Sequence, residues 1–482
     1  MPRVVRSSRS AVVVAAMTVV ALVLRLPGLR QSYFGDELFT YEVATRSSLH
    51  AVLAGVHSDL EITPPLFFVV AWVFQKVGDP FLWMRLPSLL AGVATVPLVY
   101  LLGLRTVGRR AAVVGAGLFT LSPMAIFYAT EARAYALMTM LLVLSTLALL
   151  RAMETNQWHA WAVFGLLEAG ALYTHYTAIF VLGTQAAWGL CTRRALLRQM
   201  ALAHLGAALL YLPWSSGLQE DRSAPAQKVM AAFTPFTLRS TVEHLERFVA
   251  GGPFAPLGDL PGRLGLALLA SAAAVAVVGV AWRRARAGPV HIDSRVALVG
   301  LLALAAPVGE ALYSTVGDDL LSPRNLMSSL PALALAFAAL VTALPRMAMA
   351  ITLALVTASL GLGAVKSFEP SNQRPAYGDV ADFVNAEARP GDVVLELGGF
   401  PGPPGRALEV HLDPNVKAFK VSQVDDALRA AAVSGGRIFY VRPEVPNPTS
   451  PGPAVLGSYR ATQRRTWTGL VPLTVVVFTP MG

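Results

Sequence analysis

The sequence predicts a mainly α-helical protein that crosses a membrane many times and ends in a small α/β domain. Of its 482 residues, 55% are hydrophobic and only 14% are charged, whereas about 25% are charged in an ordinary soluble domain. Apolar runs of about 15 to 20 residues recur through the first three-quarters of the chain, long enough to cross a hydrocarbon core about 30 Å thick. After Lys366 the composition becomes that of a soluble domain.

The start of the chain and its basic loops predict the topology. Met1–Ser10 is basic, Ala11–Leu26 is apolar, and no small-residue cleavage site follows, so this segment is interpreted as the first span. Basic clusters between later apolar runs, such as Arg105–Arg110, are typical of cytoplasmic loops. The N-terminus is then cytoplasmic and the C-terminal domain lies outside a bacterial inner membrane. About eleven spans are expected near residues 11–29, 86–104, 111–128, 134–151, 160–174, 177–191, 197–213, 262–281, 294–312, 325–343 and 347–364.

Two further segments are expected to be helical without crossing the membrane. Pro64–Val77 is apolar but short, and counting it as a span would place Arg105 outside, so a re-entrant or interface-lying helix is expected. Thr237–Val249 has apolar and charged residues at helical spacing, which is typical of a helix on the membrane surface. The membrane part contains no internal repeat, which disfavours a transporter built from inverted repeats.

The C-terminal domain is expected to span residues 367–482, after a membrane domain of residues 1–366. Helical and apolar strand patterns alternate in it, which predicts an α/β fold with a largely parallel sheet. The expected helices are Val380–Glu387 and Val424–Ala432, and the expected strands are Val393–Leu397, Arg437–Val441 and Val471–Phe478. Gly435-Gly436 precedes a strand instead of following one, so it is not a phosphate loop. We find no catalytic constellation in this domain.

The net charge and the cysteine content argue against nucleic-acid binding and against an intrachain disulfide. The net charge of +10 comes largely from arginines clustered between apolar runs, which indicates membrane anchoring beside anionic lipids and not nucleic-acid binding. Cys191 is the only cysteine, so the chain forms no intrachain disulfide.

Acidic residues follow the first span at Asp36 and Glu37. They lie among apolar and aromatic neighbours such as Tyr33 and Phe39, which would keep the pair partly out of water. Desolvation raises the proton affinity of a carboxylate, which suits a general base acting on a hydroxyl. The alternative is a solvated acidic pair at a membrane edge.

A second group interrupts a long apolar stretch with Glu131 and Arg133, followed by Tyr135. Charge at membrane depth is unfavourable and indicates a functional site, although a structural Glu–Arg pair is the alternative. The predicted topology places this group on the same membrane face as Asp36, so the two are expected to share one cavity.

Three more positions on that face are candidates. His175 lies with Tyr173 in a short turn between two spans, where a satisfied interface histidine is the simpler interpretation. Arg324 lies on the outward lip of a span, where its guanidinium matches phosphate oxygens or merely reaches the interface. Glu61 precedes Pro64-Pro65. Isolated acids of this kind could hold one divalent ion with a phosphate, but no metal-ligand motif is present and the cofactor stays open.

Several short motifs, taken in the order in which they occur in the chain, resemble those of the GT-C glycosyltransferases. The closest branch contains the protein O-mannosyltransferases and the aminoarabinose transferases of lipid A, including family 39-like bacterial members. The resemblance covers about residues 20–215 and, more loosely, Pro323-Arg324 and the C-terminal domain. The motifs are Asp36-Glu37, Glu61-Ile-Thr-Pro-Pro-Leu, Met84-Arg-Leu-Pro-Ser-Leu, Ser122-Pro and Glu131-Ala-Arg-Ala-Tyr-Ala-Leu.

The resemblance implies a GT-C fold, a polyprenyl-phosphate-sugar donor and an inverting displacement. Asp36 matches the catalytic carboxylate, with Glu37 orienting it or the acceptor. Arg324 and Arg133 would stabilise the leaving phosphate. Glu131 would hold Arg133 or contact a sugar. Tyr135, Glu61, His175 and Tyr173 complete the expected substrate site.

The sequence departs from the relatives at two points. Relatives commonly have Asp-x-His-Pro-Pro where this chain has Glu61-Ile-Thr63-Pro64-Pro65, so a metal or phosphate role there is in doubt. Relatives also often have Arg-Tyr where this chain has Arg324-Asn325, which removes a tyrosine that could stack on the substrate or contact the phosphate.

The sequence leaves the sugar and the acceptor open. Mannose and arabinose are the favoured sugars, and the acceptor would be an envelope glycolipid, a polysaccharide or a protein. A lipid-linked glycan transporter or flippase, or a glycan polymerase or ligase with a lipid-diphosphate donor, are the alternative functions.

Overall fold

The computed structural model describes residues 8–57, 61–225, 235–287, 292–397, 403–444 and 454–481. The chain divides into two compact units. The helical unit comprises Met1–Leu29 and Val43–Ser367, and the C-terminal unit comprises Arg30–Glu42 and Phe368–Gly482. The border after Ser367 lies one residue from the expected one, but the short segment Arg30–Glu42 groups with the C-terminal unit.

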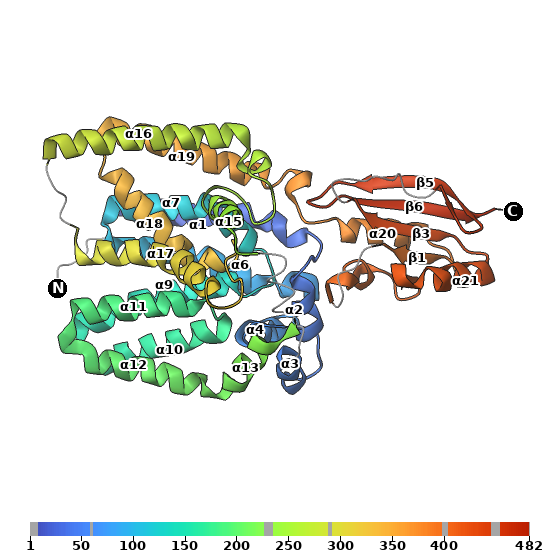
Figure 1. Cartoon of the computed structure of the whole chain (residues 1–482), viewed down its shortest axis with the longest axis horizontal. Helices are drawn as coiled ribbons and strands as arrows, with labels where there is room; N and C mark the ends of the chain where they lie inside the picture. The colour runs from blue at the N-terminus through green and yellow to red at the C-terminus, as the bar shows by residue number, and fades with distance from the viewer. Residues whose placement is uncertain are drawn as a thin grey trace. The chain divides into compact units, whose positions relative to one another are not determined.

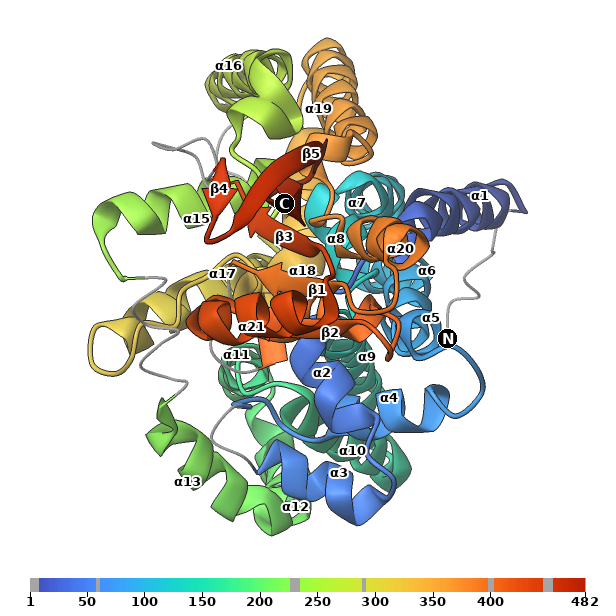
Figure 2. The same ribbon diagram turned by 90° about the vertical axis from the view of Figure 1, so that its right-hand side faces the viewer.

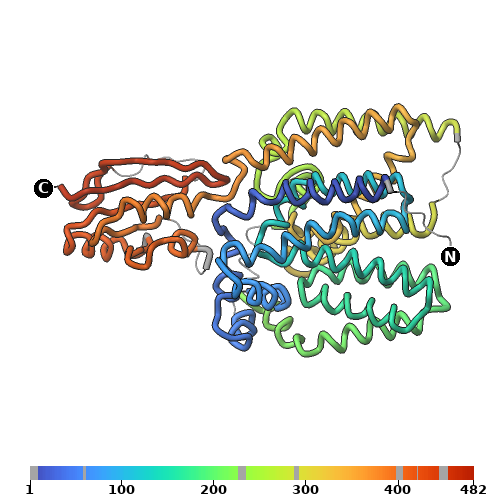
Figure 3. The backbone as a smooth tube through the Cα atoms, turned by 180° about the vertical axis from the view of Figure 1, so that it is seen from behind, coloured from blue at the N-terminus to red at the C-terminus, as the bar shows by residue number. Residues whose placement is uncertain are grey.

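The helical unit is a bundle of long, roughly parallel helices (Figures 1 and 3). The helices α16 and α19 lie side by side at its edge (Figure 2). Its helices are α1 (Ser8–Arg25), α3 (Leu49–Val56), α4 (Leu66–Phe74), α5 (Pro80–Trp83), α6 (Leu86–Thr106), α7 (Arg109–Leu121), α8 (Pro123–Tyr128), α9 (Tyr135–Thr155), α10 (Trp158–Thr174), α11 (Ala178–Thr192), α12 (Leu197–Tyr211), α13 (Ser215–Ser223), α15 (Leu238–Ala250), α16 (Arg263–Ala287), α17 (Ser294–Ser314), α18 (Leu330–Thr342) and α19 (Arg346–Lys366).

Each expected span contains a helix, but the helices differ in length. Within the described residues, eight helices are long and apolar enough to cross a membrane. The helices α7, α10 and α11 have only 13, 17 and 15 residues, so each reaches about 20 to 26 Å at 1.5 Å per residue. The mainly helical membrane fold is therefore confirmed, while the number of crossings stays a prediction.

The expected span 111–128 is divided in the structure. α7 ends at Leu121, and Ser122 caps the separate helix α8, with its side chain accepting from the Ala125 N–H at 3.5 Å. Pro123 is the reason, because a proline disfavours helical backbone at the preceding residue and fits the first turn of a new helix.

The two segments predicted to be helical without crossing are both helices. α4 has nine residues and is therefore only about 13 Å long, too short to span a membrane. α15 is capped by Thr237 and Ser240, which exchange hydrogen bonds in a capping box. The position of α15 on the membrane surface stays a prediction.

The C-terminal unit is an α/β sheet domain with strand order β2-β1-β3-β6-β5-β4. Its elements are α20 (Tyr377–Glu387), β1 (Val393–Glu396), β2 (Lys417–Lys420), α21 (Val424–Ser434), β3 (Ile438–Pro443), β4 (Val455–Leu456), β5 (Tyr459–Trp467) and β6 (Leu473–Pro480). α20 packs with one set of alternating strand side chains, such as Val394 and Phe439, and α21 packs with the other set, such as Val393 and Ile438.

The prediction of a largely parallel sheet is wrong. β1 is parallel to β2 and β3, but β6, β5 and β4 extend the sheet by antiparallel pairs. A short loop joins β5 to β6, and a connection of this length allows only antiparallel pairing. We did not expect β5 because it is mostly exposed and carries three arginines and one glutamine. Gly435 ends α21 with a φ of +66°, which accounts for the Gly435-Gly436 pair.

Candidate active site

Asp36 lies in a turn that leads into α2 (Glu37–Ala44), whose first residues belong to the C-terminal unit. Gly35 has a φ of +57°, a left-handed conformation that favours glycine, and it turns the chain into the helix. The Asp36 side chain is half-buried directly before the helix N-terminus, where the helix dipole stabilises negative charge. A partly desolvated carboxylate at a defined position is what a general base requires.

Glu37 is fully buried, next to Asp36 in the chain. Its Oε2 lies 3.4 Å from Nε of Arg374, which is also buried. Because Glu37 is buried in this ion pair, it does not face the solvent. This position suits a residue that orients the neighbouring Asp36. Arg374 was not expected, because nothing in a single sequence links positions more than 300 residues apart.

Arg133 is one of the buried charged residues of the helical unit, and it contacts the buried Glu61. The arginine follows α8 and is only 6% exposed. Its Nη1 lies 2.8 Å from Oε2 of Glu61, and its Nη2 donates to Glu61 Oε1 at 3.3 Å and to Thr63 Oγ1 at 3.0 Å. The Arg133 carbonyl accepts a hydrogen bond from Ser88 at 3.1 Å. Glu61 and Thr63 therefore act together to fix one arginine.

This arrangement explains the departure at Thr63, where relatives commonly have histidine. Its hydroxyl accepts from Arg133, so the position still supports the charged centre. Glu131, in the same turn, is buried, and its backbone carbonyl accepts from the Arg133 N–H at 2.8 Å. The role predicted for the Glu131 side chain stays a prediction.

His175 joins this group from the turn between α10 and α11. Its ring lies 5.3 Å from the ring of Tyr135, the first residue of α9. Its Nδ1 lies 2.9 Å from the Thr177 hydroxyl. Burial, and to a smaller extent the positive charges of Arg133 and Arg324, lower the pKa of His175 to about 3. His175 is therefore neutral near pH 7 and serves as a hydrogen-bonding group, not as a proton donor with a matched pKa.

Arg324 lies half-buried before a short 3-10 helix, Asn325–Ser329. Its charge acts on His175 together with that of Arg133, so two guanidinium groups create positive potential at one point. Asn325, where relatives have tyrosine, is buried and donates from Nδ2 to the Leu320 carbonyl at 2.7 Å. Asn325 thus holds the loop that carries Arg324.

Tyr173 belongs to a different group. Its hydroxyl donates to the Leu210 carbonyl at 2.9 Å, and its ring stacks at 5.1 Å against Tyr211. Nearby, Tyr176 donates to Asp221 and accepts from Trp214 Nε1 at 3.1 Å. Sequence reasoning missed Asp221, because the polar run around it is typical of a solvated loop, yet Asp221 is only 4% exposed.

The structure therefore groups most of the predicted residues of the helical unit. Glu61, Arg133, Tyr135, His175 and Arg324 are linked by contacts or by charge, whereas Tyr173 packs apart from them. Asp36 and Glu37 are ordered within the C-terminal unit, and their place in one cavity with the arginines stays a prediction. Among the described residues, no group of three His, Cys, Asp or Glu side chains is arranged to hold a metal ion.

Known proteins are similar to this chain in part of its sequence and in its fold. Residues 63–216 match the family model described as dolichyl-phosphate-mannose-protein mannosyltransferase. Among curated proteins, a sequence search found no match to this chain. The structure of ArnT from Cupriavidus metallidurans bound to undecaprenyl phosphate is similar with a TM-score of 0.54 and 15% identity, and 97% of each chain is covered.

A second similar structure is the archaeal oligosaccharyltransferase AglB from Archaeoglobus fulgidus in complex with an inhibitory peptide and a dolichol-phosphate. The TM-score is 0.52 with 12% identity, and the match covers 90% of this chain and 69% of that one. The resemblance found in the sequence is thus confirmed, and this chain has the GT-C fold, similar to the branch of the mannosyltransferases and aminoarabinose transferases.

Proposed function

We propose that this chain is an inverting glycosyltransferase of the outer face of the membrane, which moves a sugar from a polyprenyl-phosphate donor to a hydroxyl group. Mannose and arabinose are the first sugars to test. The acceptor would be an envelope glycolipid, a polysaccharide or a protein. The family match over residues 63–216 and the lipid phosphates bound in the two similar structures support a lipid-linked donor.

One observation carries the proposal. Arg133 is buried and is held by Glu61 at 2.8 Å and by Thr63 at 3.0 Å, and the charges of Arg133 and Arg324 both act on His175. The field of two guanidinium groups at one point is suited to the phosphate of the donor, because arginine offers donors that match phosphate oxygens.

In the proposed reaction, Asp36 accepts the proton of the acceptor hydroxyl while that oxygen attacks the anomeric carbon. The bond from this carbon to the phosphate oxygen breaks with inversion, and the lipid phosphate leaves with the bonding electrons. Arg324 and Arg133 stabilise the charge that develops on the phosphate. Neutral His175 and Tyr135 offer hydrogen-bonding and ring surfaces to the sugar.

The test is sugar transfer by the purified protein in detergent. Polyprenyl-phosphate mannose, arabinose, glucose and galactosamine are offered separately with a membrane extract as acceptor. We expect one donor to be consumed by the wild type, with the rate lowered at least about 100-fold in Asp36→Asn, because the base is lost. Asp426→Asn, at an exposed position of α21, is the matched control and should keep the wild-type rate. Consumption of no donor by folded protein would contradict the proposal and favour a lipid-diphosphate donor or transport.

A further inference from the structure

The segment that carries Asp36 is part of the C-terminal unit, although more than 300 residues separate it from the rest of that unit. Several contacts tie it there. Gln31 Oε1 accepts from the backbone N–H of Arg374 at 3.2 Å and from its Nη1 at 3.3 Å. Ser32 Oγ accepts from the Gly378 N–H at 2.8 Å. On the other side of Asp36, Glu37 pairs with Arg374 Nε at 3.4 Å.

Arg374 therefore contacts residues on both sides of Asp36 in the chain, Gln31 before it and Glu37 after it. It binds residue 31 with its backbone and its guanidinium, and residue 37 with the same guanidinium. The side chains of Arg374 and Glu37 are 1% and 0% exposed, so water does not replace either partner. A rigid planar fork with several donors can hold two acceptors in a fixed geometry, which the point charge of a lysine cannot do.

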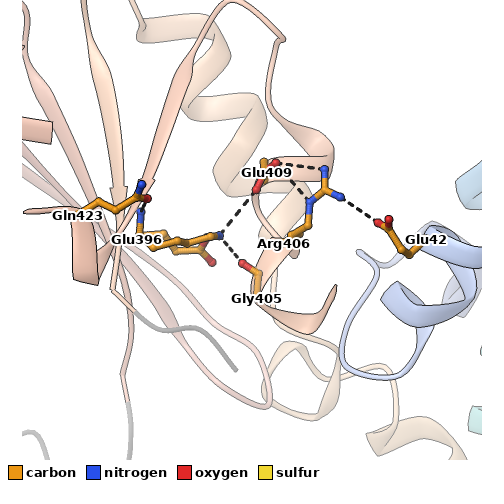
Figure 4. Close-up of polar contacts among 7 residues, drawn as sticks. Glu42, Glu396, Gly405, Arg406, Glu409 and Gln423 are labelled. Carbon is orange, nitrogen blue, oxygen red and sulfur yellow. Dashed lines mark hydrogen bonds and ion pairs between the residues drawn. The ribbon is translucent and has the colours of Figure 1, made fainter. Parts of the chain in front are cut away.

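The space around this contact is also restricted. A Cβ atom at Gly378 would lie 3.2 Å from Ser32 Oγ, so the backbone of the C-terminal unit approaches the segment closely. The ion pair of Arg406 with Glu42, by contrast, is exposed on both sides (Figure 4). The buried contact and the exposed one thus differ in how firmly they hold the chain.

We propose that Arg374 is a positioning residue that fixes residues 31–37 and with them the carboxylate of Asp36. This proposal rests on the proposed function, in which Asp36 is the base. It gives residues 368–482 a part in the reaction, because Arg374 holds the loop that supplies the base. Arg374 acts through Glu37 and Gln31 and touches no substrate.

The experiment compares Arg374→Gln, Arg374→Lys and Glu37→Gln with Arg406→Gln as the matched control, all in the full chain. We expect Arg374→Gln to lower kcat about 100-fold, the effect of a misplaced catalytic group, while KM for the lipid donor stays within about twofold, since donor binding uses other residues. Arg374→Lys should retain an intermediate kcat, and Arg406→Gln should match the wild type. The double variant Glu37→Gln with Arg374→Gln should lose no more than the single variants.

A second measurement separates this proposal from the proposed function. Hydrogen exchange of the backbone amides is followed in the wild type and in Arg374→Gln, with no substrate present. We expect faster exchange in residues 31–40 and unchanged exchange in α21 and β1, which reports that the unit stays folded.

Unchanged exchange in residues 31–40 would overturn the proposal, whether or not the wild type transfers sugar. Faster exchange with an unchanged kcat would also overturn it. If the wild type consumes no donor, the proposed function fails, and exchange alone then decides whether Arg374 fixes the segment.

Discussion

The ion pairs Arg133–Glu61 in the helical unit and Arg406–Glu42 in the C-terminal unit have the same chemistry in opposite surroundings. Their closest N–O distances are 2.8 and 2.9 Å. The side chains of the first pair are 7% and 3% exposed, and those of the second are 46% and 42% exposed. Water can replace a lost partner only in the second pair, so equal distances imply unequal consequences.

The comparison also indicates why each pair is present. Replacing a buried pair by apolar residues is often neutral or stabilising, so stability alone does not explain Arg133–Glu61. Glu61 and Thr63 instead hold one guanidinium in a fixed place, as a site for phosphate requires. Arg406 donates hydrogen bonds to both Glu42 and Glu409 at the surface. A fixed side-chain geometry has little effect on stability there, because water can replace either partner.

The largest expected effect comes from Glu61→Gln. This change leaves Arg133 buried without its carboxylate, and we expect the free energy of unfolding to fall by about 3 to 5 kcal/mol. Equilibrium unfolding in mixed detergent micelles measures it. The double variant Glu61→Gln with Arg133→Met should regain most of the loss, because neither charge remains. A loss below about 1 kcal/mol in the single variant would show that the buried pair behaves like the exposed one.

Much of the fold followed from local sequence signals, because apolar runs and capping residues act over short distances. The helical segments around 86–104 and 347–364 and the end of the membrane unit near Lys366 are examples. The break at Pro123 was not expected, although proline signals it, because the apolar run continues across it. Strand β5 was missed because most of its side chains are exposed and polar.

The sequence pointed to candidate charged residues but not to the partners that these residues contact. Arg133 was recognised because charge at membrane depth is rare, yet its carboxylate partner Glu61 lies 72 residues earlier, and Glu131 was the nearer candidate. Arg374 and Asp221 carried no signal, since each depends on a tertiary contact that brings distant segments together. Local patterns therefore found the charged groups, and only the fold assigned the pairs.

The next prediction concerns Arg324→Gln, which removes charge while Arg133–Glu61 stays intact. We expect Kd for polyprenyl phosphate to rise about tenfold, which corresponds to about 1.4 kcal/mol, because one charge-assisted contact to phosphate is lost. Fluorescence or calorimetric titration of the detergent-purified protein measures it. Arg429→Gln, at an exposed position of α21, serves as control with an unchanged Kd. An unchanged Kd in Arg324→Gln would indicate that this arginine only reaches the interface.

A smaller effect is expected from pH through His175. Its pKa of about 3 in the folded protein lies below the usual 6.5, so between these values the unfolded chain binds a proton that the folded chain does not. Stability from this group is therefore complete above pH 6.5 and is lost as pH falls. Between pH 7.5 and 5.5, the wild type should lose about 1 kcal/mol more than His175→Gln. Parallel unfolding curves for both proteins at each pH test this, and equal losses would contradict the burial of a neutral ring.

The smallest effect is expected from Arg406→Gln. Both partners of this pair keep contact with water, so the free energy of unfolding should change by less than about 1 kcal/mol. Raising the salt concentration should reduce even this difference, since salt screens exposed charges more than buried ones. The same unfolding measurements at about 0.05 and 0.5 M salt, with Glu61→Gln beside it, provide the test. If Arg406→Gln destabilised the protein as much as Glu61→Gln, and without dependence on salt, then exposure would not be what separates the two pairs, and the contacts of residues 37–42 within the C-terminal unit would have to be the cause.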